Sequence, residues 1–334
     1  MNPTNPPSMA TQGDSRALEE PHSIRSGALS VRLIDIGASI YDVRLKGVTH
    51  PLVLGLSNLN EYPGNASHMG AVAGRVANRI AGGQFEIDGR QYQGPRNLED
   101  RDMLHGGPDG FGTKTWTPAE RSATHVRFEL KSADGDAGFP GEVCASVTYT
   151  CAESSTLEIK IEATTTQPTY MNLAPHAYFN LSGEANIDDH VLTIAADHYT
   201  PVSELCIPTG EVREVHDKFD FRQAKIIGRF AYDQNYCLAK ARRSEPTFAA
   251  QLEAGGVRLK VETTEPGLQL YTGDNLSERG VDGLEGRRYA KRAGICLESQ
   301  CWPDAPHHPH FPSILITPDE PYRQVTRYRF ERSD

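Results

Sequence analysis

The stretch TLEIKIEA, residues 156–163, alternates apolar and polar side chains along its whole length. A β-strand points successive side chains to opposite faces of a sheet, so this pattern predicts a strand with one buried face. A helix would instead repeat its apolar residues every three or four positions. The stretch therefore predicts a sheet with one packed side and one solvent side.

The same alternation recurs along the chain and decides the fold class. Short turn-rich segments separate the alternating stretches, which is typical of antiparallel sheets rather than of strands alternating with helices. We therefore predict an all-β protein built as a large antiparallel β-sandwich. The patterns are LSVRLIDI (29–36), VRFEL (126–130), VRLKVE (257–262), VTRYRFE (325–331), a hairpin FEIDGRQY (85–92) with Asp-Gly at its turn, and a dense turn DGDAGFPGE (134–142).

Helical patterns are few and short. LSNLNEY (56–62) and FRQAKIIGRF (221–230) are predicted to be helices. There is no composition break and no fixed-period repeat, so residues 23–334 are expected to form a single β-sandwich domain. Residues 1–22 are rich in Pro, Ser, Asn and Thr, which predicts a disordered leader.

Composition excludes several classes of function. The 334 residues are 38% hydrophobic and carry a formal charge of −10, which argues against a general nucleic-acid binder. No apolar run is long enough to cross a membrane. The N-terminal segment lacks the basic and apolar regions of a secretory signal, so we expect a cytoplasmic protein.

Cysteine and histidine content could indicate metal or disulfide chemistry. None of the six cysteines forms a C-x-x-C pair, so we expect reduced, mostly inert thiols. Of the twelve histidines, three lie in PHHPH (306–310), where two prolines predict a rigid loop. No Cys or carboxylate stands there at zinc-ligand spacing, so we expect no metal site.

The segment GRVANRIAGG (74–83) invites a phosphate-binding interpretation. A P-loop needs Lys followed by Ser or Thr after its last glycine, but Gln84 follows Gly83 here. The three glycines of a dinucleotide-binding loop are absent as well. A turn bearing two solvated arginines is the simplest alternative.

Five other segments depart from plain strand-and-turn sequence. Each contains a histidine, an acid or an amide among apolar neighbours, and each alone is consistent with a core histidine or a solvated carboxylate. They are MLHGG (103–107), MNLAPHAYFNLSG (171–183), YDQNYCL (232–238), GLQLYTGD (267–274) and ICLESQCWPDAPHHPHFP (295–312).

Together with GRVANRIAGG, these segments resemble the aldose 1-epimerases, also called galactose mutarotases, in the order of that family. The resemblance runs from about residue 30 to the C-terminus. It implies an antiparallel β-sandwich with an open sugar cleft, and interconversion of the α and β anomers of a free aldose of the galactose or glucose type. It also implies that no cofactor or metal is needed.

The resemblance assigns roles to residues at matching positions. It implies that His176 is the catalytic acid and Glu298 the catalytic base. It implies a substrate-holding set of Asn78, Arg79, His105, Asp233 and Gln269. Such a pair suits mutarotation, since the anomeric hydroxyl must lose a proton while the ring oxygen gains one. A neighbouring carboxylate favours imidazolium, so we expect each partner in its working form near neutral pH.

Other residues near these motifs have less defined expectations. Arg75 is expected to form a structural ion pair. Trp302 fits either a sugar-stacking position or the core. Pro175 and Gln234 depart from the family's usual residues, which leaves the preferred sugar open.

Alternative functions remain at this point. An epimerase of phosphorylated hexoses would need extra cations in the cleft. A glycoside hydrolase would use Asp233 and Glu298 as its carboxylate pair. A non-catalytic sugar-binding module would not need both His176 and Glu298. The expected partner is a small monosaccharide, and the chain is expected to be a monomer or a homodimer.

Overall fold

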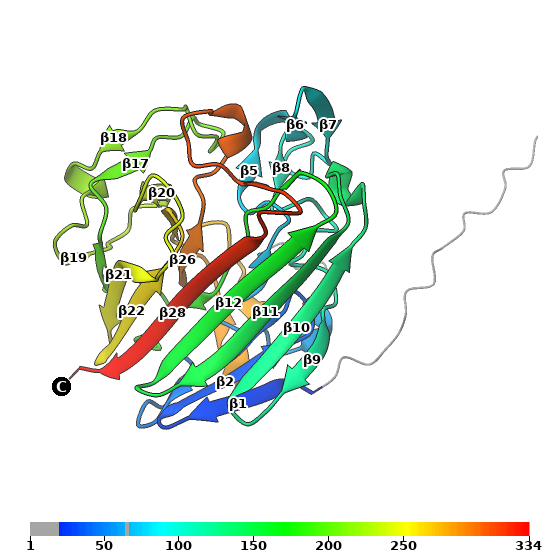
Figure 1. The fold of residues 1–334 in the computed structure, drawn as a ribbon. Coiled ribbons are helices and arrows are strands. Elements are labelled where there is room, and N and C mark those ends of the chain that lie inside the picture. The colour runs from blue at the N-terminus through cyan, green and yellow to red at the C-terminus, as the bar shows by residue number, and fades with distance from the viewer. Residues whose placement is uncertain (1–19, 64–66, 334) are drawn as a thin grey trace, which may run out of the picture.

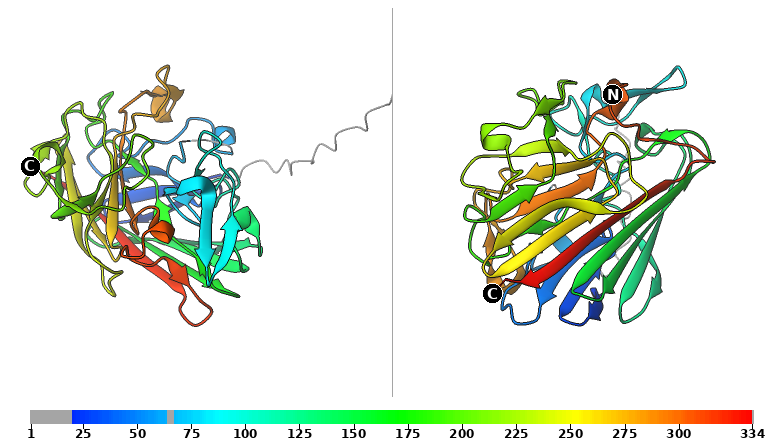
Figure 2. Two further views of the ribbon diagram at one scale, coloured as in Figure 1. Left: turned by 90° about the horizontal axis from the view of Figure 1, so that it is seen from above. Right: turned by 60° about the vertical axis from the view of Figure 1, so that its left-hand side comes forward.

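The computed structural model describes residues 20–63 and 67–333, and within them strands dominate (Figure 1). A nine-stranded antiparallel sheet forms the largest layer. Its long strands run side by side as one twisted layer in both Figure 1 and Figure 2. In sheet order they are β19 (Lys225–Ile226), β16 (Val191–Ile194), β21 (Thr247–Ala254), β22 (Val257–Thr263), β28 (Tyr322–Arg332), β12 (Thr156–Thr165), β11 (Val143–Ala152), β10 (His125–Ser132) and β9 (Thr117–Arg121).

Two further sheets complete the main layers. A six-stranded antiparallel sheet contains β15 (Tyr178–Phe179), β26 (Ile295–Gln300), β23 (Gly267–Tyr271), β20 (Asp233–Cys237), β17 (His198–Thr200) and β18 (Arg213–Glu214), in that order. A three-stranded sheet contains β1 (His22–Ser26), β2 (Leu29–Ile34) and β3 (Ser39–Leu45).

Short strand pairs and single turns of 3₁₀ helix connect these sheets. The pairs are β4 (Val72–Ala73) with β14 (Ala174–Pro175), β5 (Arg79–Ile80) with β8 (Met103–Leu104), β6 (Gln84–Ile87) with β7 (Arg90–Gln93), β13 (Thr169–Tyr170) with β27 (Leu315–Ile316), and β24 (Val281–Asp282) with β25 (Arg288–Tyr289). The 3₁₀ turns are η1 (Leu59–Glu61), η2 (Ala81–Gly83), η3 (Asp136–Gly138), η4 (Asp217–Phe219), η5 (Leu284–Gly286) and η6 (Ala305–His307).

Strand β12, which contains the stretch TLEIKIEA, explains how the sandwich is packed. Leu157, Ile159 and Ile161 are fully buried, while Glu158 and Lys160 on the other face reach solvent. Ile295 and Leu297 of β26 belong to the same core as these apolar side chains. Full burial of a side chain of this size stabilises the fold by roughly 1.5–3 kcal/mol. The predicted antiparallel β-sandwich is confirmed.

The predicted turns are present, but the two predicted helices are wrong. Asp88 and Gly89 both have positive φ between β6 and β7, as a two-residue hairpin turn requires, and η3 lies within the predicted turn 134–142. Residues 56–62 contain an isolated bridge at Leu56 and the single 3₁₀ turn η1 in place of an α-helix. Residues 221–230 contain β19, which pairs with the edge of β16. Isolated helices this short are marginal, so tertiary packing and strand pairing decide the local structure.

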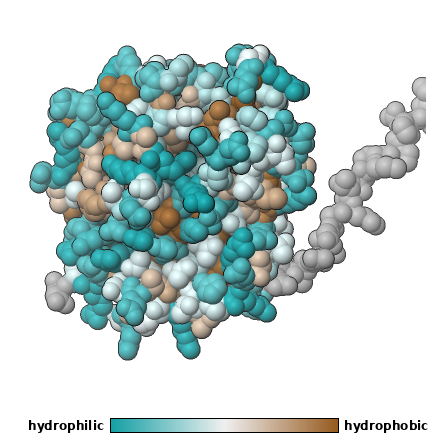
Figure 3. Space-filling view, viewed as in Figure 1, coloured by the Kyte–Doolittle hydropathy of each residue, from teal (hydrophilic) through white to brown (hydrophobic). Residues whose placement is uncertain are grey.

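Two expectations concern the ends and the surface of the chain. Strand β1 begins at His22, and residues 1–19 of the predicted leader lie outside the described residues. The face seen in Figure 3 is largely hydrophilic with scattered apolar side chains, as is usual for a folded domain. Across the described ranges, no helix combines the length and apolar character needed to cross a membrane.

Candidate active site

The six-stranded sheet carries one buried polar face. In β26, Ile295 and Leu297 face the main core, so strand alternation turns Cys296 and Glu298 to the opposite side. The register places Gln269 of β23 directly opposite Glu298, and Asn235 of β20 opposite Gln269. The pairing of three strands therefore sets these polar side chains in one row.

A second row lies two residues along the same face. Asp233 pairs with Tyr271, Tyr271 pairs with Cys296, and Cys296 pairs with Tyr178. Asp233 and Gln269, which the sequence places in separate motifs, thus come together on adjacent strands. Their side chains are joined by a hydrogen bond of 2.5 Å from Gln269 Nε2 to Asp233 Oδ1.

His176 enters this face from the short segment between β14 and β15. Its backbone N–H donates to Ala71 O, and its carbonyl accepts from the N–H of Gly70, which fixes the loop against residues 70–73. The imidazole Nε2 lies 3.6 Å from Glu298 Oε1, and Nδ1 lies 3.5 Å from Cys296 Sγ. Both predicted catalytic side chains are buried, His176 at 4% and Glu298 at 2% exposure.

The segment 74–83 forms the facing wall of the site. Asn78 has a φ of 61° and His105 a φ of 51°, left-handed conformations that are uncommon for residues with a side chain. Asn78 N–H donates to His105 Nδ1 at 3.2 Å, and His105 N–H donates to Asn78 O at 2.9 Å. This reciprocal pair fixes the imidazole and leaves its Nε2 as the protonated nitrogen.

Arg79 connects this wall to the six-stranded sheet. Its Nη2 lies 3.1 Å from Asp233 Oδ2, and its backbone N–H donates to Asn78 Oδ1 at 2.9 Å. All seven predicted site residues are therefore joined through the contacts above. The sequence alone could not show this, since Arg79 and Asp233 are 154 positions apart.

Several buried polar atoms of this site have no hydrogen-bond partner among the described residues. They are Arg79 Nε, Gln269 Oε1, Asn235 Oδ1 and Glu298 Oε2. Buried polar groups are normally satisfied, because leaving one unpaired costs about 1–3 kcal/mol. A polar ligand with several hydroxyl groups would supply both donors and acceptors here.

Burial opposes the charged forms that were expected for the acid–base pair. Burial, together with His68, lowers the pKa of His176 to about 3. Burial and then the charge of Asp233 raise the pKa of Glu298 well above its usual value, while Arg79 opposes this. The effect of burial on the two pKa values outweighs the attraction between charged His176 and charged Glu298, because the two side chains are 3.6 Å apart and form no hydrogen bond. Both shifts favour the uncharged forms of the two groups in the free site.

The sequence analysis missed two side chains of the site. His68 lies in the unassigned segment before β4, and its ring centroid lies 4.6 Å from that of His105 and 6.2 Å from that of His176. Burial lowers the pKa of His68 to about 4. Cys296 was regarded as an inert thiol, although its position two residues before Glu298 in a strand puts both on one face.

Other residues singled out in the sequence lie outside the site. Arg75 donates to Ser132 Oγ and to the carbonyls of Ser132, Ala133 and Pro140, so the predicted ion pair is replaced by hydrogen bonds to neutral oxygens. Trp302 is buried, and its Nε1 donates to Pro266 O at 2.9 Å, which is a core position.

The two departures from the family pattern and the histidine-rich loop have no side-chain contact with Glu298 among the described hydrogen bonds and ion pairs, although Pro175 directly precedes His176 in the chain. Strand alternation places Gln234 on the face of β20 opposite Asp233, and Pro175 pairs with Val72. In PHHPH (306–310), His307 Nδ1 lies 2.7 Å from Asp304 Oδ1, and His310 Nε2 contacts Gly210 O.

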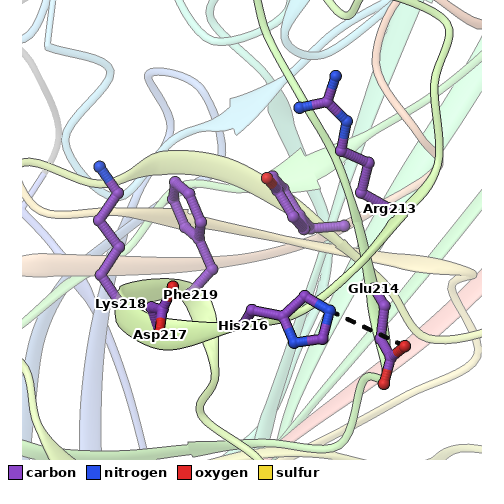
Figure 4. A pocket seen from close by; sticks show the side chains of 7 residues that line it. Arg213, Glu214, His216, Asp217, Lys218 and Phe219 are labelled. Atoms are coloured by element: carbon purple, nitrogen blue, oxygen red, sulfur yellow. Dashed lines mark ion pairs between the residues drawn. The ribbon is translucent and has the colours of Figure 1, made fainter.

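A surface hollow of about 570 Å³ lies at the edge of the six-stranded sheet (Figure 4). It contains none of the predicted site residues. Its lining comes from β17, β18 and η4, and the ion pair drawn there joins His216 Nε2 and Glu214 Oε2 at 3.9 Å. The hollow is therefore separate from the buried polar face that holds His176 and Glu298.

The β-sandwich and its buried polar face, where His176 meets Glu298, fit the class of sugar isomerases. Residues 21–329 match the family model described as aldose 1-epimerase. The chain is 41% identical to galactose mutarotase of Rattus norvegicus over 326 residues, covering 93% of this chain and 94% of that protein. It is 35% identical to aldose 1-epimerase of Escherichia coli over 330 residues, covering 92% and 94%. The chain belongs to the aldose 1-epimerase family.

Solved structures agree with this assignment. A GalM/aldose epimerase homologue from C. elegans superposes with a TM-score of 0.87 at 29% identity, covering 94% of this chain and 99% of that one. Galactose 1-epimerase from Lactobacillus acidophilus gives a TM-score of 0.81 at 26% identity, covering 97% and 98%. The resemblance read from the sequence motifs is confirmed at the level of family and fold.

Proposed function

We propose that this chain interconverts the α and β anomers of a free aldose of the galactose or glucose type by acid–base ring opening and reclosure. The observation that carries the proposal is the facing pair of His176 and Glu298, 3.6 Å apart in a buried site with unpaired hydrogen-bonding groups. Membership of the aldose 1-epimerase family supports the same reaction.

The reaction needs one proton removed and one delivered. With the proton of the pair on His176, the Glu298 carboxylate takes the proton of the anomeric hydroxyl. The C1–O1 double bond forms as the C1–O5 bond breaks, and O5 takes the proton from His176. The open aldehyde rotates about C1–C2, and the same steps in reverse close the ring on the other face. A well-placed acid or base contributes roughly 10²–10⁴-fold each.

Ligand binding has to favour this proton arrangement. In the free site, burial favours the uncharged forms of Glu298 and His176, so placing a proton on His176 needs help from the sugar and from Arg79. The guanidinium of Arg79 favours the carboxylate form of Glu298, and sugar hydroxyls that donate to Glu298 act in the same direction. The site therefore couples the reactive protonation state to substrate binding.

The remaining predicted residues hold the sugar. His105 accepts at Nδ1 from Asn78, so its Nε2–H is free to donate to a sugar oxygen. Asp233 is held on both carboxylate oxygens by Arg79 and Gln269. This leaves Gln269 Oε1 as an acceptor for a hydroxyl. The set combines donors and acceptors, as a neutral polyhydroxylated ligand requires.

A phosphorylated hexose is a poorer fit to the same site. The guanidinium of Arg79 is already paired with Asp233, and the carboxylate of Asp233 would repel a phosphate. We propose a free monosaccharide as the ligand. We also propose a reducing compartment such as the cytoplasm, because all six cysteines are free.

Polarimetry of freshly dissolved sugar anomers tests the proposed function. We expect the protein to accelerate the approach to anomeric equilibrium for galactose or glucose. Rates measured with xylose and arabinose show which other free aldoses the site accepts. Glucose 6-phosphate and heat-denatured protein are the controls. No acceleration with any free aldose would contradict the proposal, and a preference for the phosphorylated sugar would favour the alternative epimerase.

A further inference from the structure

The fold brings a cysteine into contact with the catalytic pair. Cys296 and Glu298 project from one face of β26, and His176 lies against both. The distances are 3.5 Å from Cys296 Sγ to His176 Nδ1 and 3.6 Å from His176 Nε2 to Glu298 Oε1. One donor atom from each of the three side chains lies within 4.8 Å of the other two. The sequence alone did not bring these three side chains together as a candidate ligand set.

The proposed sugar chemistry does not use Cys296, and in the free site one oxygen of Glu298 is unpaired. Cys296 is fully buried, and Glu298 Oε2 accepts no hydrogen bond from the described residues although Glu298 is only 2% exposed. A buried carboxylate oxygen without a donor is costly unless a cation or a ligand satisfies it. Within the described residues, no other set of three His, Cys, Asp or Glu side chains brings its donors this close.

Thiolate, imidazole and carboxylate together are a typical ligand set for zinc. Zn²⁺ binds sulfur at about 2.3 Å and nitrogen or oxygen at about 2.0–2.2 Å, so ligand atoms in a tetrahedral site lie roughly 3.3–3.7 Å apart. A single ion uses one nitrogen of His176, so small side-chain movements are needed to close the widest separation. Three protein ligands leave the fourth position open for water or for a sugar hydroxyl.

We propose that His176, Cys296 and Glu298 form an inhibitory site for Zn²⁺, at which the ion competes with the sugar for the acid–base pair. The inhibitory effect rests on the proposed function, but binding of the ion does not. An ion held by both His176 and Glu298 occupies the groups that exchange protons with the substrate. Catalysis itself requires no metal, so removing divalent ions should preserve or raise activity.

Cobalt substitution tests the site without reference to activity. The chelator-treated protein is titrated with Co²⁺, whose bond to a thiolate gives a near-ultraviolet charge-transfer band. We expect one equivalent of Co²⁺ to produce this band in the parent and in Cys144→Ser, which removes an exposed thiol. Zn²⁺ should abolish it, and Cys296→Ser should lack it. No band in the parent, or an equal band in Cys296→Ser, would overturn the proposal.

Inhibition kinetics test the consequence for catalysis. Zn²⁺ should raise the apparent KM for galactose without changing kcat, and excess EDTA should reverse the effect. In Cys296→Ser, with inhibition measured relative to that variant's own uninhibited rate, the inhibition constant should rise by an order of magnitude or more. Equal inhibition of both proteins, or a fall in kcat alone, would place the ion elsewhere and overturn the proposal.

A crystal of the parent protein soaked in Zn²⁺ needs no variant and decides the matter even if Cys296→Ser does not fold. An anomalous peak among the three side chains supports the site, and a peak only on surface histidines contradicts it. If the protein binds Co²⁺ as described but shows no mutarotation, the proposed function has failed and the metal site has not. The two failures are therefore distinguishable.

Discussion

Arg79 at the start of β5 and Asp233 at the start of β20 form an ion pair of 3.1 Å between Nη2 and Oδ2. Asp233 is also held by Gln269 at 2.5 Å, so it is fixed from two elements. The pair joins the wall formed by residues 74–83 to the polar face of the six-stranded sheet. The two charges also act in opposite directions on the pKa of Glu298, because Asp233 raises it and Arg79 lowers it.

Arg79→Ala should impair sugar handling while leaving the fold intact. The substitution removes a hydrogen-bond donor. It also removes the positive charge that offsets Asp233, so the pKa of Glu298 rises and its reactive carboxylate form becomes less populated. We expect kcat/KM for the best sugar to fall by about tenfold to a hundredfold. Arg90→Ala is the matched control, because Arg90 is exposed on the β6–β7 hairpin. Unchanged kinetics in Arg79→Ala would return residues 74–83 to a purely structural role.

Arg75→Ala should affect stability instead of substrate handling. The Arg75 guanidinium, only 2% exposed, donates to the carbonyls of Ser132, Ala133 and Pro140. Its loss leaves the buried carbonyls of Ser132 and Pro140 unpaired, so we expect the free energy of unfolding to fall by about 3 kcal/mol. Urea denaturation measures this. A variant as stable as the parent would mean that water or neighbouring groups replace the guanidinium.

Arg75 and Arg79, both in the segment 74–83, show which features the sequence could predict and which it could not. Strand alternation predicted the sandwich, because a strand with one buried face has an apolar residue at every second position. The family resemblance indicated His176 and Glu298, and the structure places them face to face. Which arginine meets substrate was also indicated by resemblance. The carbonyl partners of Arg75 could not be predicted, because they depend on how the turn after β10 packs.

The missed features have specific physical causes. Cys296 lies two residues before Glu298, so alternation in a strand could have placed both on one face. His68 left no sequence signal, since its proximity to His105 and His176 depends on tertiary packing alone. The predicted helix at 221–230 was wrong because pairing with β16 outweighs a weak helical pattern. The effect of burial on the pKa of His176 could not be predicted, because burial cannot be read from a motif.

The pH dependence of activity should follow the single proton shared by the pair. With the pKa of His176 near 3, the pair gains a second proton only as pH falls toward 3, so the acid limb should lie there. The pKa of Glu298 is raised, so the pair loses its last proton well above the usual carboxyl range, and activity then declines. We expect a broad bell in kcat/KM whose two limbs belong to the pair. An acid limb near 6.5 would show that His176 titrates like an exposed histidine.

His68→Phe tests the histidine that the sequence analysis missed. Charge on His68 lowers the pKa of both His105 and His176, so removing it should move the acid limb of kcat/KM to higher pH. Because the pKa of His68 is about 4, we expect little change near neutral pH. Tyr92→Phe, a partly buried ring change on the β6–β7 hairpin, is the control. An acid limb identical to that of the parent would give His68 a packing role only.

The central claim is that Glu298 and His176 together perform the proton transfers. His176→Asn keeps a hydrogen-bond donor but cannot deliver a proton as imidazolium, so kcat should fall by roughly two orders of magnitude. A double variant with Glu298→Gln should lose far less than the sum of the two single losses, because residues acting as a unit are not additive. Full additivity would show that the two side chains act independently.

Polarimetry of Glu298→Gln on the parent's best sugar tests this claim most directly. Glutamine keeps the size of the side chain but cannot accept the anomeric proton at neutral pH. Circular dichroism and an unchanged melting temperature serve to establish that the variant is folded. The account predicts that kcat falls by roughly two orders of magnitude or more. Turnover near the parental rate would contradict it and would make Asp233 the next residue to test as the base.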